Sequence, residues 1–453
     1  MELGIDSRKS FFKSMITLAL PITLQNLVSS SLNMVDTMMI GKLGANEIAA
    51  VGLANQFYFL FSLIIFGVSS GCAIFISQFW GKGDRKSIKR VLGISLLISS
   101  GIGVVFTILA VITPGMIMKF FTEDAVVIGL GKEYLIITGL SYIVTAISYT
   151  YSFASRSVGQ PKLPLFTSTV ALICNTVLNA IFIFGYFGFP AMGVKGAAIA
   201  TLIARIVEMI LIVGIIYAQK SVLAAKFSQM IDLSKDFIKI VLITIAPVIL
   251  NEFLWSLGMT MYSVAYAKIS IDAVAAVQIA TTVKNLFMVV AFGLGNACAI
   301  MIGSEIGSGN EHKAMILGKR FIKLTIAIGA VLGVIIFIAS GAITSFFNVT
   351  ESVSQSTESI LKLYSFIIPV NMLCSLFVVG VLRSGGDTKF SLFLEGGTIW
   401  FIGVPCAFLG ALVFNMSIEA VVLLSSLELV VKLIIVFPRF FSQKWVKNLV
   451  KHI

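Results

Sequence analysis

The chain has 453 residues, of which 58% are hydrophobic and only 12% are charged, and its mean hydropathy is +1.02. Soluble globular proteins carry about twice that share of charged residues, so the composition excludes an ordinary soluble domain. The net charge of +12 would suggest nucleic-acid binding in a soluble protein. In a membrane protein the rule that cytoplasmic loops are basic explains it better, so we expect a lipid bilayer and no nucleic acid as partner.

Apolar stretches of about 20 residues, long enough to cross a bilayer, follow one another along the chain. The predicted spans are 14–40, 48–80, 90–113, 130–155, 163–187, 195–219, 237–265, 273–304, 317–340, 356–382, 388–412 and 417–438. Several are longer than a bilayer requires, which indicates tilt or extension beyond the membrane. No small-residue cleavage site follows Lys13, so we expect the first span to be retained and not removed as a signal peptide.

Lysine and arginine are distributed unevenly between the two sides of these spans. Both termini and alternate loops hold 24 of the 33, whereas the opposite loops hold 6 and the spans hold 3. Because basic residues concentrate in cytoplasmic loops, the count predicts a multi-pass protein of the plasma (inner) membrane with both termini in the cytoplasm. An even number of spans agrees with this orientation.

The two halves of the sequence repeat each other. A shift of 226 residues aligns Pro21 with Pro247, the Phe-Gly pair 66–67 with 292–293, and Cys72 with Cys298. A shift of 227 aligns the Arg-Ser pair 156–157 with 383–384. We predict an all-α protein with two six-helix lobes, residues 1–225 and 226–453. Repeats of six spans enter from the same side, so a pseudo-two-fold axis along the membrane normal is expected. Such lobes enclose a central cleft suited to alternating access.

Asp36 is the acidic residue of the first span. At about 1.5 Å per residue it lies roughly 35 Å from Lys13, which is close to one full crossing. An ionised side chain in hydrocarbon is costly and marks a water-filled path or a coupling ion. The alternative is an aspartate solvated at the outer interface.

Glu252 lies near the middle of the seventh span, about 20 Å along the helix from Lys239. No basic residue lies within one turn of it, so no local ion pair is available. Such a carboxyl can take up a proton or bind a small cation. The alternative is a protonated glutamate that hydrogen-bonds to a neighbouring helix.

Amides and further charges complete the intramembrane polar residues. Asn175 and Asn179 are four apart and share a helix face, where they either join Asp36 in a polar cluster or hold helices together. Two acid–base pairs have spacings that allow neutralisation along one helix, namely Arg205 with Glu208 and Glu428 with Lys432. Glu395 follows Lys389 closely, which predicts a position near the cytoplasmic surface. Candidates for lining the substrate cleft are Gln278, Lys284, Asn33 and Tyr262.

Motifs for catalysis and cofactors are missing from the sequence. The five cysteines lie in apolar runs without C-x-x-C spacing, which favours packing over disulfides or metal. Residues 67–71 match G-x-S-x-G, but the pattern falls inside a predicted helix and indicates a small-residue packing face. No zinc motif, Walker loop or Rossmann fingerprint occurs. We expect no enzyme activity and no cofactor.

The chain resembles the multidrug and toxic compound extrusion (MATE) transporters over its whole length. The resemblance rests on Pro21 through the segment VDTMMIGKLG, on AAVGLANQ at 49–56, on GKGD at 81–84, and on Glu252 and Gln278. The loops 156–162 and 383–389 add support. It implies a monomeric secondary antiporter that expels organic, often cationic and hydrophobic, compounds in exchange for H⁺ or Na⁺.

The resemblance also assigns the coupling sites. In the first lobe it implies Asp36 with Asn175 and Asn179, and in the second lobe Glu252, with Na⁺ an alternative to H⁺ at either carboxylate. Sodium-coupled members carry an additional aspartate on the tenth helix, where this chain has Asn371 and Met372. We therefore expect proton coupling. The alternative function is a lipid-linked precursor flippase of the same superfamily, which would need several cations in its cleft.

Overall fold

The computed structural model describes residues 8–345, 347 and 349–451. The regular structure of these residues is helical, and no strand occurs among them. In the first half the helices are α1 (Arg8–Gly41), α2 (Ala45–Lys82), α3 (Arg85–Ile112), α4 (Pro114–Phe121), α5 (Ala125–Gly139), α6 (Ser141–Ser157), α7 (Lys162–Phe184), η1 (Tyr186–Gly188) and α8 (Gly193–Ala218).

The second half follows the short helix α9 (Phe227–Met230). Its helices are α10 (Lys235–Ala267), α11 (Ile271–Gly307), α12 (Glu311–Thr344), α13 (Glu351–Ser375), η2 (Leu376–Arg383), α14 (Thr388–Thr398), η3 (Ile399–Gly403), α15 (Val404–Phe408), η4 (Leu409–Val413), α16 (Ile418–Ser425) and α17 (Leu427–Phe441). The segments η2, η3 and η4 are π-helical. π-Helical turns are rare and often occur at functional sites.

Twelve apolar spans are present if the bent pair α5 and α6 counts as one. Eleven helices in the described part of the chain are long and apolar enough to cross a membrane, and α5 and α6 meet at a bend of 48°. Each predicted span overlaps one of these segments. The predicted all-α fold with twelve membrane-spanning helices is thereby confirmed.

The chain divides into two compact units. One contains Leu24–Leu242, and the other contains the residues up to Thr23 together with those from Ile243 onward. Consequently α1 and α10 each begin in one unit and end in the other, and their changeover points lie close to Pro21 and Pro247. The lobe limits of 1–225 and 226–453, and the axis relating the lobes, stay predictions.

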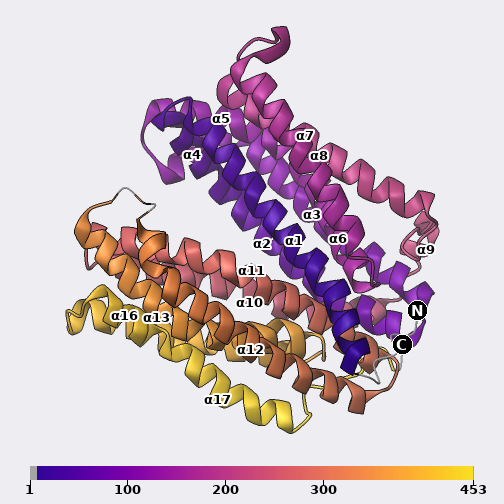
Figure 1. Ribbon diagram of the computed structural model, residues 1–453. Coiled ribbons are helices and arrows are strands. Elements are labelled where there is room, and N and C mark those ends of the chain that lie inside the picture. The colour runs from indigo at the N-terminus through magenta and orange to yellow at the C-terminus, as the bar shows by residue number, and fades with distance from the viewer. Residues whose placement is uncertain (1–7, 346, 348, 452–453) are drawn as a thin grey trace. The chain divides into compact units, whose positions relative to one another are not determined.

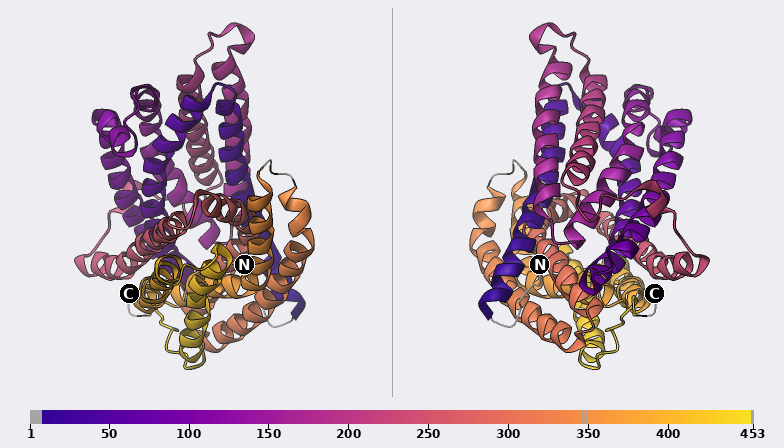
Figure 2. Two further views of the ribbon diagram at one scale, coloured as in Figure 1. Left: turned by 90° about the vertical axis from the view of Figure 1, so that its left-hand side faces the viewer. Right: turned by 90° about the vertical axis from the view of Figure 1, so that its right-hand side faces the viewer.

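In the unit of Leu24–Leu242, α7 lies beside α8 and α3 beside α6 (Figure 1). The connection between α7 and α8, which contains η1, projects beyond the helices of that unit (Figure 2). Apolar side chains, many of them alanine, isoleucine or aromatic, from α1 to α8 form its core. Phe237 at the start of α10 also belongs to this unit, where its ring stacks on that of Phe79 with centroids 6.2 Å apart.

The other unit has a single continuous core that includes the start of α1. There the ring of Phe11 packs edge-on against Phe321 of α12. After α17 the chain turns back, and Trp445 stacks on Phe440. Asp387, which precedes α14, is buried and accepts from Arg439 at 2.8 Å and from Lys447 at 2.5 Å. These contacts fix the end of the chain to the loop between η2 and α14.

Candidate functional site

Asp36 lies in a cluster of neutral side chains. Asn179 Nδ2 donates to Asp36 Oδ1 at 2.5 Å and to Asn175 Oδ1 at 3.0 Å. Asn175 Nδ2 donates in turn to Thr201 Oγ1 at 3.4 Å. The spacing of four residues on α7 places both amides on one face, as the sequence predicted. The predicted hydrogen-bonded cluster of Asp36, Asn175 and Asn179 is therefore present.

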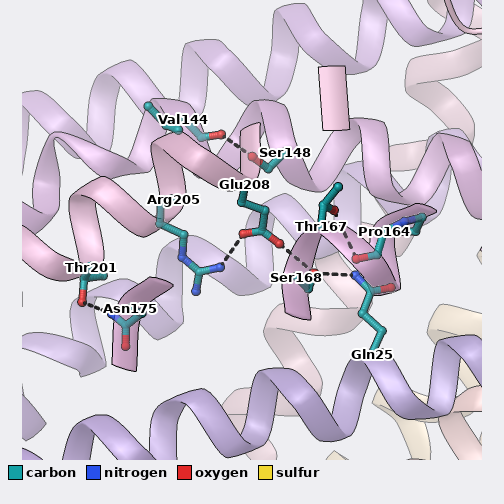
Figure 3. A network of polar contacts seen from close by, with 10 residues as sticks. All are labelled: Gln25, Val144, Ser148, Pro164, Thr167, Ser168, Asn175, Thr201, Arg205 and Glu208. Carbon is teal, nitrogen blue, oxygen red and sulfur yellow. Dashed lines mark hydrogen bonds and ion pairs between the residues drawn. The ribbon is translucent and has the colours of Figure 1, made fainter. Parts of the chain in front are cut away.

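A second network joins α1, α6, α7 and α8, and Figure 3 shows its part from Gln25 through Ser168 and Glu208 to Arg205. Arg156 donates from Nε and Nη2 to Gln25 Oε1 at 3.1 and 2.6 Å. Gln25 Nε2 donates to Ser168 Oγ at 3.1 Å, and Ser168 Oγ donates to Glu208 Oε1 at 2.7 Å. The predicted pair on α8 is also present, because Arg205 Nη1 lies 2.9 Å from Glu208 Oε2. Arg156, which the sequence groups with the loop 156–162, belongs to the last turn of α6 and is buried in this network. The side of the membrane on which it lies stays a prediction.

The corresponding network of the other unit consists of ion pairs. Arg383 Nη2 lies 2.6 Å from Glu252 Oε1 and 3.8 Å from Glu395 Oε2. Asn251 Nδ2 donates to Glu395 Oε2 at 2.5 Å, and Lys432 Nζ lies 3.9 Å from Glu395 Oε1. Arg383 is 2% exposed and is the last residue of η2, not part of the loop that follows; the side of the membrane on which it lies stays a prediction. Glu252 has a basic partner, which comes from a distant helix and not from its own.

Glu395 and Lys432 meet across helices. Glu395 takes part in this ion-pair network, and its predicted depth near the cytoplasmic surface stays a prediction. Lys432 Nζ lies 3.9 Å from Glu395 Oε1, and the charge of Glu428, one turn away on the same helix, also acts on it. Oε2 of Glu428 and the hydroxyl of Tyr262 both lie against Gly403, and neither makes a hydrogen bond of regular geometry among the described residues. The two side chains are close enough to interact with each other.

The two networks occupy equivalent positions in the repeat. With shifts of 226 or 227 residues, Gln25 corresponds to Asn251, Arg156 to Arg383, Ser168 to Glu395, and Arg205 to Lys432. In both units the first residue of this set bonds to the third. The two halves therefore share this one contact, whereas the partners of the two arginines and the charge of the network differ. Within one sequence, aligning the polar residues of the two halves would have revealed this correspondence.

The candidates for the substrate cleft have different surroundings. Tyr262 is buried and Gln278 is exposed. Lys284 is half-buried, and its ammonium lies over the ring of Tyr364, 4.6 Å from the centroid. The side chain of Asn33 lies outside the described residues. In the described part of the chain, no group of three or more His, Cys, Asp or Glu residues is arranged to hold a metal ion.

Comparison with protein families gives a match to the family model MatE over residues 21–181 and 247–409. Among named proteins, the probable multidrug resistance protein NorM of Thermotoga maritima is 25% identical over 97% of this chain and 94% of its own. The uncharacterized transporter YisQ of Bacillus subtilis is 24% identical over 96% and 95%.

Solved structures share the fold. A mutant of the Vibrio cholerae MATE transporter VcmN matches with a TM-score of 0.88 and 20% identity, covering 97% of this chain and 98% of its own. An outward-facing multidrug resistance MATE transporter of the MOP superfamily matches with a TM-score of 0.85 and 20% identity, covering 95% and 96%. Both are transporters described as MATE proteins, whose twelve helices form two lobes.

Proposed function

Since the chain belongs to the MatE family and is therefore a multi-pass multidrug efflux transporter, we propose that it exports hydrophobic organic cations in exchange for protons by alternating access. The single observation that supports the coupling step best is the environment of Asp36. Its hydrogen-bond partner Asn179 is neutral, and the nearby Arg205 is already paired with Glu208. A carboxylate without a fixed counter-ion can be neutralised by a proton or by an organic cation in turn, which is what exchange requires.

Glu252 is the second coupling residue of this proposal, and its role differs from that of Asp36. Its ion pair with Arg383 favours the ionised carboxylate. A proton can bind there only when the pair opens, so Glu252 would respond to the conformation of its unit. Sodium in place of the proton at either carboxylate is the competing assignment.

Transport by purified protein in liposomes tests the proposal. Uptake of a fluorescent organic cation is measured with an imposed pH gradient and, separately, with an imposed sodium gradient. We expect the pH gradient alone to drive transport, and Asp36→Asn to reduce it to the level of protein-free liposomes. Glu252→Gln should also abolish coupled transport. Glu358→Gln, in an exposed ion pair with Lys362, serves as the control and should transport normally.

The possible outcomes separate the alternatives. Transport that persists in Asp36→Asn and Glu252→Gln, with both proteins correctly inserted, would refute carboxylate coupling. Transport driven only by sodium would identify Na⁺, and not the proton, as the coupling ion.

We further propose that the protein is a monomer in the plasma membrane with both termini in the cytoplasm. Accessibility labelling of single cysteines near either end would test the position of the termini.

One observation favours the lipid-linked precursor flippase as the second candidate. Besides Arg205, Lys284 and Lys432, the described structure buries Arg156 and Arg383, so more cations are available to an anionic substrate than the spans indicated. Most of these cations already have acidic partners. Transport of an anionic lipid-linked precursor, and not of an organic cation, would establish this alternative.

A further inference from the structure

The Asp36 cluster has a counterpart in the other unit that consists of different residues. In the repeat register, Tyr262 corresponds to Asp36, Cys406 to Asn179, and Glu428 to Thr201. The acid therefore lies on the first helix of the repeat in one unit and on the last helix of the repeat in the other. Where one unit places a carboxyl against amides, the other places a carboxyl beside a phenol.

Glu428 and Tyr262 are both buried, with 8% of each side chain exposed. Gly403 of η3 makes their approach possible, because a Cβ at this position would collide with the hydroxyl of Tyr262 and contact Oε2 of Glu428. Neither oxygen makes a hydrogen bond of regular geometry among the described residues, although the Tyr262 hydroxyl is close enough to the Glu428 carboxyl to interact with it. A buried carboxylate oxygen without a regular hydrogen bond is costly, so the ionised form is poorly accommodated here.

The charges around Glu428 lead to the same conclusion. Glu252 is paired with Arg383, and Glu395 is the ion-pair partner of Lys432, so Glu428 is the third acid beside two buried bases. The titratable groups that face it come from five helices: Lys432 of α17, Glu395 of α14, Tyr262 and Tyr266 of α10, Lys284 of α11, and Cys374 of α13. The ammonium of Lys284 already lies over the ring of Tyr364.

We propose that Glu428, with Tyr262 beside it, is an additional proton-binding site of this transporter. Its role in antiport rests on the proposed proton coupling, whereas the binding of the proton does not. The proton bonds to Oε2 while the pocket is dry, and it passes to water when the pocket is hydrated. Lys432, one turn away, stabilises the carboxylate that remains. A hard metal cation would require about six oxygen ligands, whereas the two oxygens here are enough for a proton.

Infrared difference spectroscopy of the purified protein tests this site without transport. All proteins carry Asp36→Asn, so that the absorption of a protonated carboxyl does not come from Asp36. We expect such a band in neutral buffer, its disappearance in alkaline buffer, and its loss in Glu428→Gln. Glu358→Gln should retain the band. Labelling glutamate with ¹³C should shift it, which shows that the band comes from a glutamate even if Glu428→Gln fails to fold.

The outcomes are distinct from those of the transport assay. Persistence of the band in a folded Glu428→Gln protein, or no ¹³C shift, would overturn the assignment. Loss of the band on addition of sodium chloride at constant pH would show that Na⁺ displaces the proton and would also overturn it. If the band behaves as expected but a pH gradient drives no transport, the proton site stands and the proposed coupling fails.

Discussion

The two units hold equivalent polar residues by different chemistry. In the unit of Leu24–Leu242, Arg156 binds the neutral amide of Gln25, and Asp36 binds the neutral amide of Asn179. In the other unit Arg383 binds the carboxylate of Glu252. An acid among amides can gain or lose charge without leaving a buried opposite charge behind, whereas an acid in an ion pair cannot. The unit of Leu24–Leu242 thus has Asp36 among amides besides its Arg205–Glu208 pair, whereas the other unit holds two acids in ion pairs and has Glu428 beside them.

Removing the arginine of each network should therefore lower the stability of the protein by unequal amounts. These are the largest effects that we expect. Arg383→Met strands a buried carboxylate and should lower the free energy of unfolding by about 3–5 kcal/mol. Arg156→Met leaves only a neutral amide without its donor, for a loss of about 1–3 kcal/mol. Thermal unfolding in detergent measures both. Each variant should be compared with wild-type protein in the same lipid and detergent.

A double variant checks the cause. Glu252→Gln combined with Arg383→Met removes both charges and should recover part of the stability lost in Arg383→Met alone. Gln25→Ala added to Arg156→Met should give no such recovery. Equal losses for the two arginines, or no recovery in the first double variant, would contradict the distinction between ion pairs and amides.

Asn179 and its counterpart Cys406 give the second test of the comparison. Asn179→Ala removes a hydrogen bond to the Asp36 carboxylate, and hydrogen bonds to charged groups contribute about 1.5–3 kcal/mol. Proton-driven transport should fall by roughly 10- to 100-fold, since 1.4 kcal/mol corresponds to a factor of ten. Cys406→Ala should change it by less than about twofold, because a cysteine packs as a small apolar side chain. Transport rates in liposomes at matched protein density measure both, and similar losses would contradict this prediction.

Patterns within single helices made most of the fold predictable. Hydropathy alone predicted all twelve spans, because each must cross the bilayer without help from its neighbours. The spacing of Asn175 and Asn179, and of Arg205 and Glu208, also predicted contacts that are present, since both pairs lie on one face of one helix.

Partners on different helices could not be predicted in this way. Glu252 of α10 and Arg383 of η2 are 131 positions apart, so their ion pair depends on tertiary structure and not on spacing within one helix. The sequence places Arg156 and Arg383 in cytoplasmic loops, because positive charge near a span end usually indicates a loop. Both belong instead to helix ends that are covered by protein, and the side of the membrane on which they lie stays a prediction. The sequence pairs Lys432 with Glu428 on its own helix, yet a carboxylate from another helix, that of Glu395 on α14, also lies 3.9 Å from the Lys432 ammonium.

The smallest expected difference concerns the caps of α3 and α12, which are equivalent in the repeat. Asp84 caps α3, because its Oδ1 accepts from the backbone N–H of Ser87 at 3.0 Å and its Oδ2 from the Ser87 hydroxyl at 2.7 Å. Asn310 precedes α12 without a side-chain bond to its backbone. Asp84→Ala should cost about 1 kcal/mol of unfolding free energy at neutral pH, and Asn310→Ala only about 0.3 kcal/mol or less.

Acid should remove the contribution of Asp84. Partial burial raises the pKa of its carboxyl, but the two hydrogen bonds from Ser87 outweigh burial, and the pKa lies below its usual range. A carboxyl whose pKa is lower in the folded than in the unfolded protein stabilises the folded protein. This contribution is complete at pH values above the unfolded pKa of about 3.9, and it is lost as the pH falls through the folded pKa. The stability difference between wild type and Asp84→Ala should therefore be constant from pH 8 to about pH 5 and shrink below about pH 4. A difference that grows on acidification would mean that Ser87 does not stabilise the ionised carboxylate.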